Sequence, residues 1–535
     1  METLRTWAQN TPITLESWLL SFIGIVLIRT FFEQFSNADH MRYVLIDLPT
    51  LVHYGVFYLA VALAFMTVFL FFARISFKEA SVLCLFGMSI IWLPPIIDLI
   101  AAGPGGHVMT YLFVPANQLI LRFFTFFGGH ISQGITLGIQ IEIIVGLIFT
   151  FLYIKTVTKN VTHAVSAAIT LYVIIFILLS IPSVISLFLS RDLSTTQTFF
   201  TSIVSSKIIS ANIHPAFYAT DTGLLDIAFN KTMTGVFTLC TLIFGSLAFF
   251  LGLKDKLLAV LKNSRLDRIV HFMLLILLGV GFAHIFSPAP YFNNWINIQM
   301  FLLTCIAFVC AWVFSVLQND LEDIEIDKIS NTNRPLVVNT LSHHDIQVAS
   351  KIFLLLAFLA AYAASHYTLF FVTFFIFIYY IYSMPPLRLK RFVGLNSFLV
   401  SLACLSTILA GFFLVSANKS LLAIPFGLIL GIVIFFTAVT NIKDIKDTEG
   451  DRQAGIVTVP TLLGKRKAQY VIGTVISLFF LIIPWYFSIP VLLVPSIIAA
   501  GLSWYVITKK NYKELQGFAV YMLYLIVIII VLMIT

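Results

Sequence analysis

The sequence predicts an all-α, polytopic membrane protein, and both its composition and the spacing of its apolar runs indicate this. Of the 535 residues, 60% are hydrophobic and only 10% are charged, and the mean hydropathy is +1.00. Apolar runs of about 20 residues recur along the whole chain, and each can cross a hydrocarbon core of about 30 Å as a helix. We expect about fifteen spans, because very short turns join the helix pairs around Ser365 and Pro490.

The first half of the chain predicts about six spans. The residues before the first of them lack the short apolar core and small-residue cleavage site of a secretory signal, so we expect this span to remain in the mature protein. After the third span, an amphipathic aromatic stretch from Tyr111 to Phe127 is expected to lie in the membrane interface or to re-enter the membrane. The expected spans are 13–32, 51–73, 79–102, 134–155, 163–189 and 233–253.

A basic, polar stretch from Lys254 to Arg268 is the clearest domain boundary. It divides the chain into an N-terminal transmembrane domain, 1–255, whose role the sequence does not indicate, and a C-terminal domain, 256–535. The second domain predicts about nine spans. These are 269–286, 297–318, 347–364, 367–383, 394–415, 421–441, 468–486, 489–507 and 515–535.

The formal net charge of +8 reports membrane topology. A basic chain can bind nucleic acid, but here the basic residues gather in alternate loops, so we expect no nucleic-acid partner. By the positive-inside rule these loops and the N-terminus face the cytoplasm of a cell or cytoplasmic membrane, and the C-terminus lies outside. The basic loop residues of the second half include Lys254, Lys256, Lys262, Arg265, Arg268, Arg388, Lys390, Arg391, Lys443, Lys446, Lys509, Lys510 and Lys513.

The five cysteines predict no metal site and no disulfide. They all lie in apolar runs without metal-type spacing, so we interpret them as packing residues. They are Cys84, Cys240, Cys305, Cys310 and Cys404.

Two aspartate clusters with the same spacing, each directly after an apolar run, are the main chemical signal. In both, steps of three and then four residues would stack three carboxylates on one face of a helix. Such like charges at the edge of a membrane are costly unless cations lie among them, and carboxylate oxygens suit Mg²⁺ completed by water and phosphate. We therefore expect the two faces to hold a diphosphate between metal ions. The clusters are Asp320, Asp323 and Asp327, and Asp444, Asp447 and Asp451.

One such cluster could equally be a solvated helix end, but two of the same spacing, with accompanying motifs, favour a site. NDLEDIEID with Asn333, Arg334 and Pro335 resembles the first aspartate motif of the UbiA-type intramembrane prenyltransferases. KDIKDTEGDRQAG, running on to TVPTLLG, resembles the second. YSMPPLRLKR, followed by Gly394 and Asn396, is similar to the segment between them. The resemblance covers about residues 260–535 and does not cover the first half.

The resemblance implies a nine-helix bundle around a central cavity, in which the two motifs bind a prenyl diphosphate through Mg²⁺. Asp320, Asp323, Asp444 and Asp447 would hold the metal. The implied catalytic residues are these four with Asn319, Asp327, Asp451 and Tyr382, and the implied substrate-binding residues are Arg334, Arg388, Lys390, Asn396 and Lys443.

The expected reaction follows from these charges. Metal and basic groups stabilise the departing diphosphate, an allylic carbocation forms in a dry aromatic cavity, and an acceptor takes it. The second motif is similar to that of members acting on glycerol phosphates or homogentisate-like rings, so the expected acceptor is an aromatic compound or a glycerol-phosphate lipid, in lipid or quinone biosynthesis.

Two alternatives remain at this point. The first is phosphoribosyl transfer to a polyprenyl phosphate, as in a branch of the same superfamily that keeps the second motif less well. The second is a cation-coupled lipid transporter, although that function would place its charges at the middle of the membrane.

Two carboxylates lie in apolar runs of the N-terminal half, Asp98 and Glu142. Charges inside a membrane are expensive and often mark function. A carboxylate paired with a neighbouring helix, or lying near an interface, is the interpretation that we favour over an ion or headgroup path.

Overall fold

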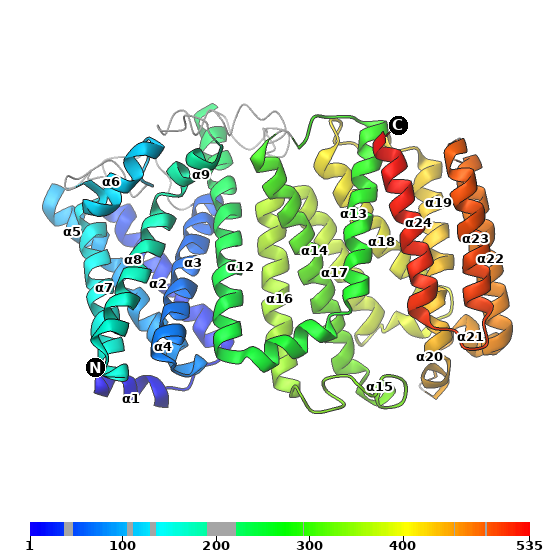
Figure 1. Ribbon diagram of the computed structural model, residues 1–535, viewed down its shortest axis with the longest axis horizontal. Helices are drawn as coiled ribbons and strands as arrows, with labels where there is room; N and C mark the ends of the chain where they lie inside the picture. The colour runs from blue at the N-terminus through cyan, green and yellow to red at the C-terminus, as the bar shows by residue number, and fades with distance from the viewer. Residues whose placement is uncertain are drawn as a thin grey trace. The chain divides into compact units, whose positions relative to one another are not determined.

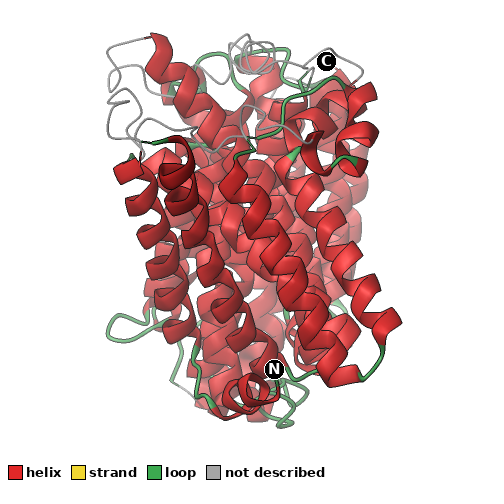
Figure 2. Cartoon of the chain, turned by 90° about the vertical axis from the view of Figure 1, so that its left-hand side faces the viewer, coloured by secondary structure: helices red, strands yellow, loops and turns green. Residues whose placement is uncertain are grey.

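The computed structural model describes residues 1–36, 47–103, 111–128, 135–189, 221–292, 294–453, 455–486 and 489–534, and these form helices and loops without a β-strand. Figure 2 shows this all-helical character, which confirms the expected fold class. Fifteen described helical segments, some of them made of consecutive helices as in Phe77–Ala102 and Phe426–Gln453, are long and apolar enough to cross a membrane, six beginning in the N-terminal half and nine after it. The chain is a multi-pass integral membrane protein with the number of spans expected from its sequence.

The chain forms two compact units, Met1–Leu257 and Leu258–Thr535. Unit 1 contains a short helix α1, before its first span, and the helices that follow along the chain (Figure 1). The stretch from Tyr111 to Phe127 contributes the six-residue helix α6 and short 3₁₀ turns on either side of it, but no span. The helices of unit 1 are α1 Glu2–Asn10, α2 Leu15–Ser36, α3 Leu48–Ala73, α4 Phe77–Met88, α5 Leu93–Ala102, α6 Leu119–Phe124, α7 Leu137–Thr158, α8 Val161–Leu179, α9 Ile181–Leu189 and most of α12 Asp221–Asn263.

Asp98 has a structural role in unit 1. Its Oδ1 atom accepts a 2.8 Å hydrogen bond from the backbone N–H of Gly138, in the first turn of α7. The first N–H groups of a helix have no partner within the helix, and a carboxylate there also interacts favourably with the helix dipole. The expectation that this carboxylate pairs with a neighbouring helix is confirmed.

Unit 2 is a bundle of long helices with three short ones, α15, α20 and α21, at one end (Figure 1). The last long helix, α24, ends at the opposite end of this unit. The helices are α13 Leu266–Phe286, α14 Trp295–Glu322, α15 Ile324–Ser330, α16 His343–Ala364, α17 His366–Ser383, α18 Leu395–Val415, α19 Phe426–Val439, α20 Asn441–Gln453, α21 Val459–Leu463, α22 Lys465–Tyr486, α23 Leu493–Thr508 and α24 Glu514–Ile534.

Local sequence explains where these helices start and how the end of α14 is held. Ser342 and Asp345 form a reciprocal capping box that begins α16, and Thr458 with Thr461 does the same for α21. The C-terminal part of α14 packs on α16 through a buried apolar cluster. Its members are Val260, Val313, Leu317, Leu341 and Ile346.

Helices α13 and α18 approach each other unusually closely because each presents a glycine to the other's backbone. A Cβ atom at Gly279 would overlap the carbonyl oxygen of Ile408, and one at Gly411 would overlap that of Ile276. Small residues permit such backbone contact between membrane helices, where van der Waals packing replaces the hydrophobic effect. This contact fixes two walls of the bundle.

We expect Gly411→Ala to destabilise the protein by about 1–3 kcal/mol or more, because backbone cannot yield to the added methyl group as a side chain can. The measurement is the thermal unfolding midpoint of the full chain in detergent. Gly501→Ala is the matched control, since a Cβ at Gly501 in α23 meets no atom within 4 Å. Equal midpoints for the two variants would show that α13 and α18 are not in close contact.

Candidate active site

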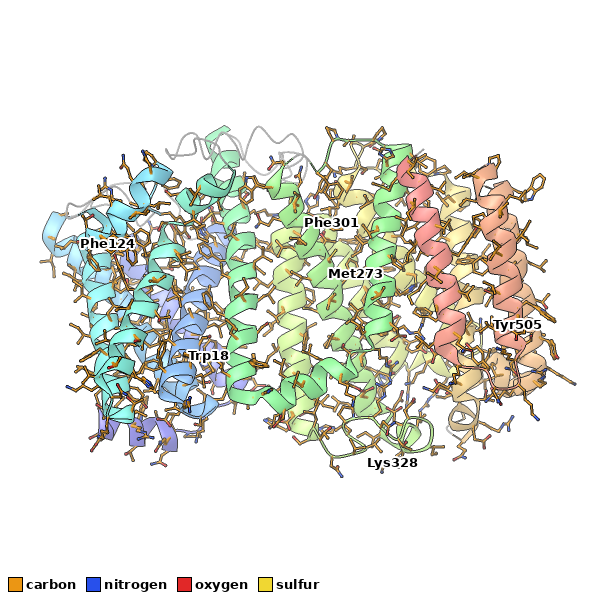
Figure 3. The ribbon with its side chains drawn as sticks, in the orientation of Figure 1. Trp18, Phe124, Met273, Phe301, Lys328 and Tyr505 are labelled. Carbon is orange, nitrogen blue, oxygen red and sulfur yellow. The ribbon has the colours of Figure 1, made fainter. Side chains whose placement is uncertain are left out.

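A cavity of about 370 Å³ lies in unit 2 and is lined by residues of both aspartate clusters. Asp323 and Asp327 line it from the first cluster, and Asp444, Asp447 and Asp451 line it from the second. Helices α15 and α20, which carry parts of the two clusters, pack against each other at the same end of the unit (Figure 1). Figure 3 labels Lys328 of α15 at this end and Phe301 of α14 toward the other. Two segments more than 100 residues apart therefore form one site.

The second cluster is helical as expected, but the first is not. Asp444, Asp447 and Asp451 all lie on α20. In the first cluster α14 ends at Glu322, Asp323 has φ −104° and ψ 17°, and α15 begins at Ile324. The expectation of three carboxylates stacked on one continuous helical face is thus wrong here. Asp320 and Asp327 both lie 3.9 Å from Arg334, whereas Asp323 pairs with Arg388 and Lys390.

Asp320 is almost fully buried, with 2% of its surface exposed. Its Oδ2 atom accepts a 2.6 Å hydrogen bond from Asn263, whose own Oδ1 accepts one of 2.9 Å from Arg334. Arg265 and Arg334 lie 3.7 and 3.9 Å from its carboxylate. Asp320 is not among the residues that line the cavity, and instead holds two arginines that are.

Both oxygens of Asp323 are bound by basic side chains. Arg388 Nη2 donates to Oδ1 at 2.8 Å, and Lys390 Nζ donates to Oδ2 at 2.5 Å. Lys390 also donates to Asn319 Oδ1 at 3.1 Å, and Ser383 Oγ donates to the same atom at 2.9 Å. Burial lowers the pKa of Lys390, and the neighbouring Asp323 opposes this. The segment between the motifs thus holds the start of the first cluster.

The second cluster has fewer basic partners. Asp444 accepts a 3.3 Å hydrogen bond from Asn396 Nδ2, and its neighbour Lys443 turns to Tyr382, donating to the hydroxyl at 2.7 Å. The Lys443 ammonium also lies 4.9 Å from the centre of the Tyr382 ring. Asp447 Oδ1 is buried and accepts no hydrogen bond from the described residues. This end of the cavity therefore contains a buried carboxylate oxygen that can accept a cation.

A polar bridge joins the clusters. Lys446 Nζ on α20 donates to Asn331 Oδ1 at 3.0 Å, and Asn331 Nδ2 donates to Asp327 Oδ1 at 2.9 Å. Burial raises the pKa of Asp327 to about 6, against the opposing effect of Arg334 and together with the repulsion of Asp320. The bridge holds α15 beside α20 and keeps both clusters facing the cavity.

The donor set fits Mg²⁺, although it does not form a closed protein cage. Among the described residues no group of three or more acidic, His or Cys side chains gathers closely enough to hold one ion. Asp320 Oδ1 and Asp447 Oδ1 are buried and form no hydrogen bond with any residue that the structure describes, and every candidate donor is a hard oxygen. Mg²⁺ usually takes one or two carboxylates and completes its shell with water and phosphate oxygens, which is what this arrangement permits.

The inner part of the cavity is apolar and aromatic. Phe272 and Trp312 lie on its wall with ring centroids 5.1 Å apart, and Trp312 meets Tyr379 at 5.5 Å. Phe436 and Phe518 complete this lining from α19 and α24. The cavity thus combines acidic and basic groups with an aromatic chamber.

The structure brings eleven of the thirteen expected site residues to the cavity wall. Asp320 and Arg388 are the exceptions, and each contacts a residue that does line it. The eleven are Asn319, Asp323, Asp327, Arg334, Tyr382, Lys390, Asn396, Lys443, Asp444, Asp447 and Asp451.

Sequence reasoning missed several groups around the start of α13 and at the start of α24. Arg265 and Arg268 line the cavity, and Asn263 supports it. Arg268 is ion-paired with Glu514, and its guanidinium lies 4.0 Å from the centre of the Phe518 ring. The basic run before α13 was interpreted only as a topology signal. Its position directly before the helix that leads to the first cluster could have suggested a role.

Known proteins resemble unit 2. Residues 274–527 match the model of the UbiA prenyltransferase family. Naringenin 8-dimethylallyltransferase 2 of Sophora flavescens is 28% identical over 192 residues, 34% of this chain and 45% of that protein. Homogentisate solanesyltransferase of Arabidopsis thaliana is 29% identical over 242 residues, 41% and 61% of the two chains. Digeranylgeranylglyceryl phosphate synthase of Thermococcus gammatolerans is 31% identical over 173 residues, 30% and 58%.

The chain spans about half the length of the curated relatives it matches. Among solved structures, a UbiA homologue from Archaeoglobus fulgidus bound to GPP and Mg²⁺ aligns with a TM-score of 0.41 and 19% identity, covering 52% of this chain and 100% of that one. The family match lies wholly within unit 2 and contains both aspartate clusters. The expected resemblance of the C-terminal half to the UbiA prenyltransferase family is therefore confirmed.

Proposed function

We propose that unit 2 is a Mg²⁺-dependent prenyltransferase that moves a prenyl group from a polyprenyl diphosphate to a small aromatic or glycerol-phosphate-type lipid acceptor. The observation that carries this proposal is the single cavity in which two carboxylate clusters, basic side chains and aromatic walls meet. Named relatives include dimethylallyl and solanesyl transferases with naringenin and homogentisate in their names, and a glyceryl phosphate synthase. The proposal therefore includes both aromatic and glycerol-phosphate acceptors.

The acidic and basic residues divide the task of binding the donor. Asp444 and Asp447, with Asp320 and Asp323, would hold Mg²⁺, which when bound neutralises the diphosphate and helps it to leave. Arg388 and Lys390 are bound to Asp323 in this structure, and they can donate to diphosphate oxygens once another cation offsets that carboxylate. Arg334 also lines the cavity and can form a forked contact with the same group.

The reaction breaks the bond between the allylic carbon and the diphosphate oxygen. The bonding electron pair leaves with the diphosphate, the acceptor nucleophile then attacks the allylic cation, and the acceptor loses one proton. The aromatic chamber excludes water during this step, and the faces of Phe272, Trp312 and Tyr379 can stabilise the positive charge. Tyr382, fixed by Lys443, lies between the chamber and the charged end.

The proposed orientation of the chain in the membrane rests on the end of unit 2 that carries the carboxylate clusters. Unit 2 places its carboxylate clusters on the end away from the C-terminus (Figure 1). Basic residues of the loops at this end predict that it faces the cytoplasm, with the N-terminus cytoplasmic and the C-terminus outside. Donor and Mg²⁺ would then enter from the cytoplasm, and the acceptor from the membrane or the cytoplasm.

Substitution of Asn263 tests whether its hydrogen bonds hold Asp320 and Arg334 of the site in place. Asn263→Ala removes both hydrogen bonds that join Asp320 to Arg334, and a buried acceptor left without its partner costs about 1–3 kcal/mol. Asn263→Asp should be worse, because it places a carboxylate beside Asp320. We expect affinity for inorganic diphosphate with Mg²⁺ to fall in the order wild type, Ala, Asp. Unchanged affinity in both variants would exclude this support.

Metal binding can be followed without turnover. A ligand that binds only the folded protein raises its unfolding temperature, so added Mg²⁺ should stabilise the wild type. Asp447→Asn should reduce this shift, because Asp447 has a buried oxygen without a hydrogen-bond partner in the described residues. Glu449→Gln is the control, since Glu449 is exposed on the same helix. An equal Mg²⁺ shift in both variants would contradict the assignment of Asp447.

The reaction itself is tested by mass spectrometry of products after incubation with geranylgeranyl diphosphate, Mg²⁺ and a panel of phenolic and glycerol-phosphate acceptors. We expect a prenylated acceptor that disappears with EDTA and falls by about 10²–10³ in rate in Asp444→Asn, as when a charge-stabilising group is removed. Glu449→Gln should retain the rate. Failure to release diphosphate from any prenyl donor would exclude prenyl transfer.

A further inference from the structure

Unit 1 contains a cavity of its own, of about 350 Å³, formed by residues of α3, α4, α5, α7 and α8 together with the 3₁₀ turn that joins α4 to α5. Its wall is almost entirely aliphatic and aromatic. Among the described residues that line it, Glu142 is the only charged one. A single carboxylate on an otherwise apolar wall, inside a membrane-spanning helix, needs a physical explanation because such a charge is expensive there.

Among the described residues Glu142 forms no hydrogen bond or ion pair within 4.0 Å, and Arg29, which acts on it electrostatically, is itself paired with Glu33. Arg29 Nη2 binds Glu33 Oε2 at 2.7 Å, and both side chains are buried. The Arg29 guanidinium lies 5.4 Å from the ring centre of Tyr58, which lines the cavity. Because Arg29 is paired with Glu33, Glu142 has no cation within ion-pair distance among the described residues.

The rest of the wall suits a hydrocarbon chain. Phe149 lies seven residues after Glu142 on α7, about 10 Å further along the helix axis. Its ring meets those of Phe65 and Phe86 at centroid distances of 6.1 and 5.9 Å, and all three line the cavity. Phe86 and Val145 are also partly exposed, so the cavity is bordered by side chains on the surface of the helices.

We propose that this cavity binds a membrane amphiphile that carries a primary amine on a hydrocarbon chain, with the ammonium group on Glu142 and the chain against Phe65, Phe86 and Phe149. A protonated amine neutralises the carboxylate and donates a charge-assisted hydrogen bond to it. An alcohol would donate a hydrogen bond but leave the charge, and an anionic headgroup would be repelled. The proposal concerns unit 1 alone and does not depend on the activity of unit 2.

The probes are three amphiphiles with one chain and different heads, namely hexadecylamine, hexadecanol and hexadecanoate. Their equilibrium binding is measured to the full chain in phosphatidylcholine nanodiscs, with empty nanodiscs as the blank. We expect saturable binding of the amine, weaker binding of the alcohol and none of the carboxylate. Glu142→Gln should weaken amine binding about tenfold or more, because it removes the ionic partner of a charge-assisted hydrogen bond.

Two glycines provide a matched test of the cavity. Gly146 lines it, and a Cβ added there meets no atom within 4 Å, so Gly146→Leu should fill the cavity and abolish binding. Gly24→Leu is the control, because a Cβ at Gly24 also meets nothing and this residue does not line the cavity. Thermal unfolding midpoints verify that each variant folds. If Gly146→Leu does not fold, Glu142→Asp, which keeps the charge, should still prefer the amine whereas Glu142→Gln should not.

Equal binding of the three probes would overturn the proposal, since the headgroup would then not be recognised. Amine binding that is unchanged in both Glu142→Gln and Gly146→Leu would also overturn it, because the amine would then bind elsewhere or partition only into lipid. Asp444→Asn in unit 2 should leave amine binding unchanged, which separates this site from the proposed prenyl transfer.

Discussion

The compensation of carboxylates by basic side chains at the end of unit 2 is the interaction on which the rest of its site depends. Asp320 is held by Asn263, Arg265 and Arg334, and Asp323 by Arg388 and Lys390. Without these partners, several negative charges at the edge of a low-dielectric bundle would repel each other strongly. The same cations are those that a diphosphate attracts. Binding of the donor with a divalent ion can therefore exchange one set of ion pairs for another instead of creating charge.

This exchange requires walls that stay in place. The close backbone contact of α13 with α18, and the apolar cluster between α14 and α16, hold the helices from which the charged ends extend. The Lys446–Asn331–Asp327 bridge then sets α15 against α20. Because the rigid part is apolar and the polar part lies at helix ends, the side chains can change partners there without disturbing the packed core.

The sequence predicted those features of the fold that depend on periodicity and composition. The fifteen spans follow from hydropathy, and the continuous helix of the second cluster follows from its three- and four-residue steps. The break at Asp323 was not predicted, because residue spacing does not report backbone dihedrals and the break is stabilised by distant Arg388 and Lys390. The role of Asn263 was missed for a related reason, since its partner Asp320 is 57 residues away along the chain.

The two units solve the problem of charge near lipid in different ways. In unit 2 each carboxylate of the first cluster has a basic partner, and the excess negative charge gathers on the second cluster at a helix end, where a hydrated metal ion can reach it. In unit 1 the excess falls on Glu142 within a spanning helix, in a wall that offers no other charged group among its described residues. A divalent ion needs several oxygen donors, which that wall lacks, whereas one ammonium group needs a single carboxylate and a place for its chain. The chemistry of each site therefore follows from the number of oxygens that surround its excess charge.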